Sequence, residues 1–255
     1  MQIYVADVQV APGWTGNQAL TVFFSGCDFK CPHCNTPSLL EFKQETLVEL
    51  RMVKSLIKSS PLQHVFFTGG EPCVQRTALT NLARAAKDKG MKVGLDTNGS
   101  RPETLLGLLH QQVVDYVCFD YKAPLNKQFQ EVTRAGTFFK PVQDVILAVE
   151  QSLSLLRKHQ HDVAVDIKTV IVPGLLFRKE ELYKIAERLD WFNGRWVLTP
   201  FSPVNTHAKW QSIEPPGELF MEQLVQDLQE KYPHLHIALE PASHYTPGSH
   251  LRIEE

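Results

Sequence analysis

The chain has 255 residues, 43% of them hydrophobic, which is enough to bury a substantial core as one α/β barrel or as two smaller domains. Its 26 Lys and Arg residues nearly balance 28 Asp and Glu residues, and no dense cationic run indicates a nucleic acid partner. No segment approaches the roughly 20 apolar residues that span a bilayer, and five cysteines, an odd number, do not suit a disulfide framework. We therefore expect a cytoplasmic protein without a membrane segment.

Short apolar runs typical of β-strands alternate with helical patterns from residue 19 onward. The predicted strands are residues 20–25, 64–68, 92–97, 116–121, 163–172 and 196–201. The predicted helices, with Leu, Ile, Val and Ala at three- and four-residue steps, are residues 46–58, 77–89, 103–111, 142–158, 179–189 and 218–231. Six such units predict parallel strands with right-handed crossovers, as an incomplete barrel or as an open doubly wound sheet. We expect a single domain over residues 1–255, with a core at about 19–240, an N-terminal extension and a C-terminal tail.

Three cysteines, Cys27, Cys31 and Cys34, follow the first predicted strand with C-x3-C-x2-C spacing. A structural zinc site closes its tetrahedron with a fourth Cys or His, for which Cys73 or His33 is available. An electron-carrying cluster normally has four protein thiolates. A 4Fe–4S cubane held by three thiolates instead keeps one iron free to bind a small molecule, which favours catalysis over scaffolding.

Polar residues follow the next three predicted strands. The segments are Thr68-Gly69-Gly70-Glu71-Pro72, Asp96-Thr97-Asn98-Gly99 and Asp120-Tyr121-Lys122. Paired glycines let the backbone approach a ligand closely, and Glu71 adds an acceptor for an ammonium group. Because the carboxyl ends of parallel strands meet at one end of a barrel, these segments and the cysteine loop predict a single ligand site. Lys168, on the fifth strand, either points into the barrel toward this site or is a solvated lysine.

The cysteine segment, with His33 in the usually aromatic position before the third cysteine, resembles the signature of radical S-adenosylmethionine (SAM) enzymes. The resemblance implies a partial (β/α)6 TIM-like barrel of the radical SAM type. It also implies a 4Fe–4S cluster on the three cysteines, whose free iron binds the amino and carboxylate groups of SAM. One electron then cleaves the sulfonium and gives a 5′-deoxyadenosyl radical. The implied cofactor-binding residues are His33, Gly69, Gly70, Glu71, Pro72, Asp96, Asn98, Asp120 and Lys168, and Lys122 joins the cysteines as a catalytic residue.

Three later segments are similar to those of glycyl radical enzyme activating proteins, above all the activating proteins of anaerobic ribonucleotide reductase and pyruvate formate-lyase. The segments are residues 96–99, 120–125 (Asp-Tyr-Lys-Ala-Pro-Leu) and 170–174 (Val-Ile-Val-Pro-Gly). This resemblance implies a glycyl radical enzyme as the protein substrate and flavodoxin or ferredoxin as the electron donor. It further implies a monovalent cation beside SAM at Asp96, Thr97 and Asp120.

Two alternatives stay open. After the third cysteine the chain has Asn35-Thr36, where the activating proteins often have His-Asn. An Asp-Thr pair there is typical of 7-carboxy-7-deazaguanine synthase, a radical SAM enzyme that acts on a small molecule. The six repeats and the Lys-Ala-Pro-Leu and Val-Pro-Gly segments favour the activating protein. The alternative of a different class is a non-enzymatic zinc or iron–sulfur binding protein.

Overall fold

The computed structural model describes residues 1–14 and 16–242, and the strands in this part of the chain form one sheet. The strands are β1 (Gln2–Pro12), β2 (Gln18–Phe24), β3 (Leu47–Glu49), β4 (His64–Gly69), β5 (Lys92–Thr97), β6 (Tyr116–Asp120), β7 (Ala164–Ile171), β8 (Arg195–Pro200) and β9 (His236–Leu239). Their order in the sheet is β3-β1-β2-β4-β5-β6-β7-β8-β9. From β2 onward the neighbouring strands are parallel, whereas β1 is antiparallel to both β2 and β3.

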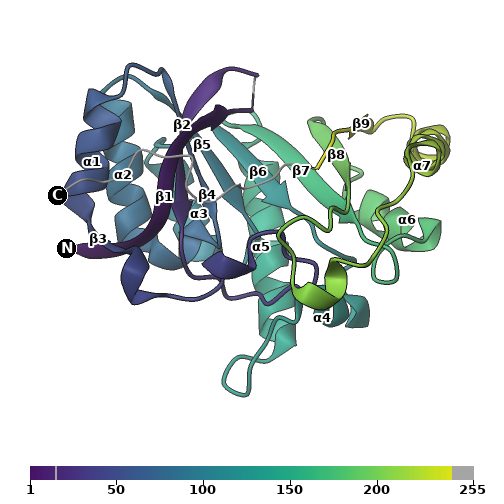
Figure 1. Ribbon diagram of the computed structural model, residues 1–255. Coiled ribbons are helices and arrows are strands. Elements are labelled where there is room, and N and C mark those ends of the chain that lie inside the picture. Colours follow the sequence, from purple (N-terminus) through teal and green to yellow (C-terminus); the bar gives the residue numbers. More distant parts are fainter. Residues whose placement is uncertain (15, 243–255) are drawn as a thin grey trace.

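Helices follow the parallel strands and cover the outer side of the curved sheet (Figure 1). The α-helices are α1 (Leu50–Ser59), α2 (Arg76–Asp88), α3 (Pro102–His110), α4 (Lys127–Thr133), α5 (Val142–His159), α6 (Lys179–Arg188) and α7 (Glu218–Lys231). Short 3-10 helices are η1 (Pro37–Leu39), η2 (Gln44–Thr46), η3 (Pro72–Gln75) and η4 (Ala208–Trp210). Because the parallel strands follow chain order, right-handed crossovers place all these connections on one face of the sheet. The result is the predicted partial barrel, with β3 and β9 as its edges, and not a doubly wound sheet, in which the strand order would reverse.

The two faces of the sheet differ in what they bury. Alternate residues of the strands point outward and pack under the helices as the main hydrophobic core, among them Val22, Phe67, Leu95, Phe119, Ile167 and Leu198. The intervening residues point into the barrel and include polar and charged side chains. The inward-facing residues that the strand register aligns near the carboxyl ends include Thr68, Asp96, Asp120, Lys168 and Thr199.

The six predicted strands and six predicted helices are all present, most within one or two residues of the expected bounds. The segment before Ala19 is more than an edge extension, because residues 2–12 form β1, which pairs with β2. The first predicted helix begins at Leu50 rather than at residue 46, because residues 47–49 pair with β1 as β3. The expected tail lies mostly outside the described residues, but residues 236–239 before it add β9 to the sheet.

The connection between β1 and β2 closes the amino-terminal end of the barrel interior. The indole of Trp14 stacks on the Tyr116 ring, with centroids 5.0 Å and planes 5° apart. Gly94 makes room for this contact, since a β-carbon there would lie 2.5 Å from the Trp14 ring. Across the described residues, no helix has the length and apolar character needed to cross a membrane.

Candidate active site

A cavity of about 500 Å³ opens at the carboxyl ends of the parallel strands. It brings together nearly all of the predicted site residues, namely Cys27, Cys31, His33, Cys34, Gly69, Gly70, Glu71, Asp96, Thr97, Asn98, Asp120, Lys122 and Lys168. Pro72 is the predicted residue that does not line the cavity, because it begins η3 and is buried behind it. Five strands therefore converge on one site, as the sequence predicted.

Backbone contacts hold the cysteine loop in place. Gly26 has a φ of +92° and donates its N–H to Leu39 O at 2.8 Å, while its carbonyl accepts from Glu71 N at 2.9 Å. Gly70 allows this close approach, since a β-carbon there would lie 2.4 Å from Gly26 O. Farther along, Lys30 N donates to the carbonyl of Thr133 in α4. The loop is thus fixed by protein atoms on both sides.

The three thiols of this loop face the same cavity and form no disulfide. Cys27 Sγ accepts from Phe29 N at 3.4 Å and lies 3.8 Å from Asn98 Nδ2, so donors are aimed at the sulfur. Burial raises the pKa of the Cys31 thiol to about 12, which means that a bound cation must offset the charge of a thiolate there. In the part of the chain that the structure describes, no three His, Cys, Asp or Glu side chains already converge as a metal site. These three thiols lie on one loop and form no disulfide, and such a set of donors fits an iron–sulfur cluster.

An acidic residue that the sequence analysis missed ties the loop to β5. Asp28 Oδ1 accepts from Asn98 Nδ2 at 3.2 Å and from Ser100 Oγ at 2.9 Å. Its second oxygen, Oδ2, accepts from Arg101 Nε at 3.1 Å. The sequence features that could have indicated this contact are the aspartate directly after the first cysteine and the polar residues that follow β5. These contacts hold the first cysteine against the end of β5.

Glu71 joins three segments of the site. Its side chain is buried, and Oε1 accepts from Cys73 N at 2.9 Å and from Thr97 Oγ1 at 2.8 Å. Oε2 accepts from Asn98 N at 2.6 Å. Burial, with a further contribution from Asp28, raises the pKa of this carboxyl to about 7 despite these donors. The carboxylate therefore already fastens the turn after β4 to the end of β5, and its acceptance of an ammonium group stays a prediction.

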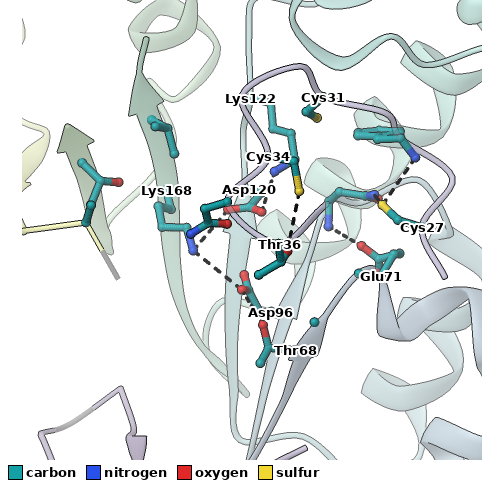
Figure 2. A pocket seen from close by; sticks show the side chains of 18 of the residues that line it. Cys27, Cys31, Cys34, Thr36, Thr68, Glu71, Asp96, Asp120, Lys122 and Lys168 are labelled. Carbon is teal, nitrogen blue, oxygen red and sulfur yellow. Dashed lines mark hydrogen bonds and ion pairs between the residues drawn. The ribbon is translucent and has the colours of Figure 1, made fainter. Parts of the chain in front are cut away.

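Two aspartates and two lysines form a chain of ion pairs across β5, β6 and β7 (Figure 2). Lys168 Nζ lies 3.7 Å from Asp96 Oδ2 and 3.4 Å from Asp120 Oδ1. Lys122 Nζ lies 2.7 Å from Asp120 Oδ2, and Thr68 Oγ1 donates to Asp96 Oδ2 at 3.0 Å. Burial raises the pKa of Asp120, but the two lysines outweigh it and lower the pKa to about 2. Lys168 thus points into the barrel and is not a solvated lysine.

This arrangement does not suit the monovalent cation that the resemblance implies. The Lys168 ammonium group already lies between the carboxylates of Asp96 and Asp120. The Thr97 hydroxyl is directed away from them, because it donates to Glu71 on the other face of β5. The cation therefore stays a prediction.

His33 presents a neutral imidazole to the cavity. Burial, reinforced by the Lys122 charge, lowers the pKa of the His33 ring to about 3. Its Nδ1 atom is buried and has no hydrogen-bond partner among the described residues. A neutral ring with one free nitrogen can stack on a heteroaromatic ligand and hydrogen bond to it.

A family model decides the class of this site. The model of the radical SAM superfamily matches residues 21–189, which include the end of β2, the cysteine loop and β3 to β7. The chain belongs to the radical SAM superfamily. It is therefore a radical SAM enzyme, and the non-enzymatic alternative is not supported.

Several curated relatives of this radical SAM enzyme are activating enzymes. One from Methanocaldococcus jannaschii, provisionally named a glycyl-radical enzyme activating enzyme, is 32% identical over 80% of this chain and 81% of its own. The pyruvate formate-lyase-activating enzyme of Streptococcus mutans is 27% identical over 78% of this chain and 76% of its own. A 7-carboxy-7-deazaguanine synthase from Hyperthermus butylicus is 34% identical over 78% of this chain and 87% of its own. Sequence identity alone thus does not decide between the activating enzymes and the 7-carboxy-7-deazaguanine synthases.

Solved structures agree with the radical SAM fold. A radical SAM methyltransferase from Sphaerobacter thermophilus superposes with a TM-score of 0.62 over 94% of this chain and 78% of that chain, at 13% identity. SuiB of Streptococcus suis, bound to its precursor peptide SuiA, gives a TM-score of 0.61 over 84% of this chain but 46% of its own, at 16% identity. At these identities, the likeness is one of fold.

Proposed function

We propose that this radical SAM enzyme installs a glycyl radical on a partner enzyme such as anaerobic ribonucleotide reductase. Cys27, Cys31 and Cys34 would hold the 4Fe–4S cluster, and the free iron would bind SAM. When bound there and reduced by one electron, SAM breaks at a carbon–sulfur bond into methionine and a 5′-deoxyadenosyl radical, which takes the hydrogen atom from the glycine α-carbon. The electron would come from flavodoxin or ferredoxin in the cytoplasm.

The side chains around the cavity suit the two ends of SAM. Lys122 and Lys168 supply ammonium groups that can approach its carboxylate, since each is already held in place by an aspartate. The Gly69-Gly70 turn lets backbone atoms lie against the methionine end, and Asn98 stands beside Cys27. His33 offers its neutral ring to the adenine. These roles follow from the resemblance and are supported by the shared cavity.

Relatives support a peptide glycine as the substrate more than a small heterocycle. The relative from Methanocaldococcus jannaschii, provisionally named a glycyl-radical enzyme activating enzyme, matches 80% of this chain. The cavity lining also includes the aromatic rings of Phe23, Phe66 and Phe201, against which a peptide backbone can pack.

A second candidate, action on a small heterocycle, is favoured by one observation. The relative from Hyperthermus butylicus, named for its synthesis of 7-carboxy-7-deazaguanine, is as similar to this chain as the activating enzymes are. Asn35 and Thr36, which are intermediate between the two subfamily patterns, both line the cavity. They are placed to contact a substrate of either class.

Transfer of an isotope tests the proposal. The cluster is reconstituted anaerobically, reduced with titanium(III) citrate, and mixed with SAM and an anaerobic ribonucleotide reductase that contains α-deuterated glycine. We expect a glycine-centred paramagnetic signal and one deuterium in the 5′-deoxyadenosine that forms. The control is the same reductase with its radical glycine replaced by alanine.

Two results would contradict the proposal at different levels. Failure of the reduced protein to cleave SAM would contradict reductive cleavage itself. Catalytic turnover of a pterin-like substrate without any partner protein, with no signal on the reductase, would assign the enzyme to the second candidate.

A further inference from the structure

A second hollow is also lined by residues of the cysteine loop, and it shares Leu40 with the main cavity. Its volume is about 440 Å³, and we call it the basic groove. Its lining residues are Lys30, Pro32, Pro37, Leu40, Glu41, Lys43, Arg134, His207, Lys209 and Trp210. They come from the cysteine loop, residues 37–43, the residue that follows α4, and residues 207–210. Segments that are far apart in sequence thus gather cationic side chains in one place.

Most of the charged side chains of the basic groove are positive. Lys30, Lys43, Arg134 and Lys209 are cationic, whereas Glu41 is the acidic residue of the lining. Lys43 lies 3.9 Å from Glu45, but the other three cations are exposed and take part in no ion pair within the described residues. Unpaired charges of one sign around a hollow attract an oppositely charged partner and speed its association.

The groove adjoins the segment that carries the proposed cluster ligands. Cys27, Cys31 and His33 line the main cavity, whereas Lys30 and Pro32 line the basic groove. Lys30 and Pro32 are the covalent neighbours of Cys31, and consecutive Cα atoms are about 3.8 Å apart. A molecule in the groove therefore contacts residues that are adjacent in sequence to a proposed cluster ligand. The main cavity stays free for SAM and substrate.

We infer that the basic groove docks an acidic one-electron carrier protein that reduces the cluster. This inference rests on the proposed reductive cleavage of SAM, which consumes one electron in each event. In the step itself the carrier loses one electron and the cluster gains it, and no covalent bond forms or breaks. The lining also has apolar residues, which give the carrier a contact from which water is excluded: Pro32, Pro37, Leu40 and Trp210.

A protein substrate fits the groove less well than a carrier does. Its glycine must enter the main cavity, but Lys30 and Arg134 line the basic groove and not the main cavity. An electron, in contrast, has to arrive at the sulfur atoms without displacing SAM. The position of the charges therefore matches the route of the electron.

Charge reversal tests this inference with the reconstituted enzyme and reduced flavodoxin as the acidic carrier. The docking variant carries Arg134→Glu and Lys209→Glu, both outside the cysteine loop. The matched control carries Lys158→Glu and Lys184→Glu, two exposed lysines of the outer helices α5 and α6, so both variants have the same net charge. We measure SAM cleavage with flavodoxin and, separately, with titanium(III) citrate, a small reductant that needs no protein docking.

With flavodoxin, we expect the docking variant to need more than about tenfold more carrier for half-maximal cleavage, while the control stays within about twofold of the wild type. Wild-type cleavage driven by flavodoxin should also slow as salt is added, because exposed charges are screened. With titanium(III) citrate, all three proteins should cleave SAM at the same rate.

Equal flavodoxin dependence of the docking and control variants would overturn the inference, and so would a docking variant impaired only in radical transfer to the partner reductase. If the double variant fails to hold its cluster, Lys209→Glu alone is tested in the same way. Loss of cleavage by the wild type with both reductants would instead contradict the proposed function.

Discussion

The cysteines of the chain differ in what surrounds them. Cys27, Cys31 and Cys34 line the main cavity on one loop, whereas Cys73 and Cys118 are buried apart from it. Burial raises the pKa of the Cys118 thiol as it does that of the Cys31 thiol, so the pKa does not distinguish the two groups of cysteines. Position on the cavity wall therefore distinguishes the predicted cluster ligands from the core residues.

Replacement of Cys31 by serine should abolish cluster binding. The reconstituted variant should hold less than about one iron atom per chain, against about four for a complete cubane, because an alkoxide is a poor ligand for this cluster. Iron analysis and the absorption spectrum measure the loss. Cys118→Ala is the control and should load iron like the wild type; equal loss in both variants would contradict the ligand assignment.

The titration of Glu71 should appear in the stability of the cluster-free protein. Folding raises the pKa of Glu71 from its ordinary 4.5 to about 7, so its contribution to stability is complete below pH 4.5 and is lost as the pH rises through 7. Relative to Glu71→Gln, the wild type should lose about 3 kcal/mol of unfolding free energy over this range. Urea unfolding of both proteins at several pH values measures the difference, and parallel curves would contradict the shifted pKa.

At the scale of elements, the site depends on how closely two turns approach. The turn after β4 touches the cysteine loop at Gly70, where a β-carbon would lie 2.7 Å from Leu39 O as well as 2.4 Å from Gly26 O. Backbone atoms cannot give way as a flexible side chain can. A side chain at position 70 must therefore push the cysteine loop out of place.

Gly70→Ala should destabilise the protein by about 1–3 kcal/mol and reduce cluster loading, because the added methyl group overpacks the turn. Gly107→Ala is the matched control. Gly107 lies within α3, and a β-carbon there would lie 3.7 Å from its nearest neighbour, Arg76 Nη2. Alanine should therefore stabilise the helix by about 0.5–1 kcal/mol. Thermal unfolding and iron content measure both effects. A Gly70→Ala variant that loads iron normally would show that the loop tolerates the displacement.

The elements differ in how far the sequence could predict them. The parallel strands and long helices could be predicted because each has a clear apolar period. β1 was missed although residues 2–12 are rich in apolar residues, because a register shift between Val5 and Asp7 breaks the alternation. β3 and β9, with three and four residues, are too short to show a period, and the seven-residue α4 has no more than two turns.

The parts of the site also differ in how far the sequence could predict them. The cysteine loop and the Gly-Gly-Glu-Pro turn could be predicted because their residues are contiguous in sequence. The pairing of Asp28 with Ser100 and Arg101 could not, because it joins residues more than 70 positions apart. The basic groove was missed for the same reason, since Lys30, Arg134 and Lys209 each stand alone in the sequence. Such links depend on how the sheet curves.

At the scale of the whole molecule, the barrel interior is closed at one end and open at the other. Trp14 closes the amino-terminal end, where it stacks on Tyr116 and lies near Phe66 and His64, with centroids 6.0 and 5.3 Å away. On the same inner face, Tyr116 donates a hydrogen bond to Asp166, which also pairs with Arg195 of β8. This end of the barrel therefore supports the structure, while the other end holds the site.

Trp14→Ala should lower the free energy of unfolding by about 2 kcal/mol, less than the 3–5 kcal/mol typical of a fully buried aromatic ring, because Trp14 is half-buried. Cluster loading should stay unchanged, since the cysteine loop lies at the opposite end of the barrel. Chemical denaturation and iron analysis test the two expectations together. Loss of iron without loss of stability would show that the two ends are coupled.

The cysteine loop is anchored through Gly26, Asp28 and Lys30, and each of these anchors joins one protein atom to another. The path of the loop is therefore encoded in the polypeptide, whereas the side chains of the described residues do not already converge as a metal site. If a bound cluster were lost, the loop would keep its anchors, and the three thiols would close again around newly supplied metal. Repair then requires a supply of iron, sulfide and electrons, but no new round of folding.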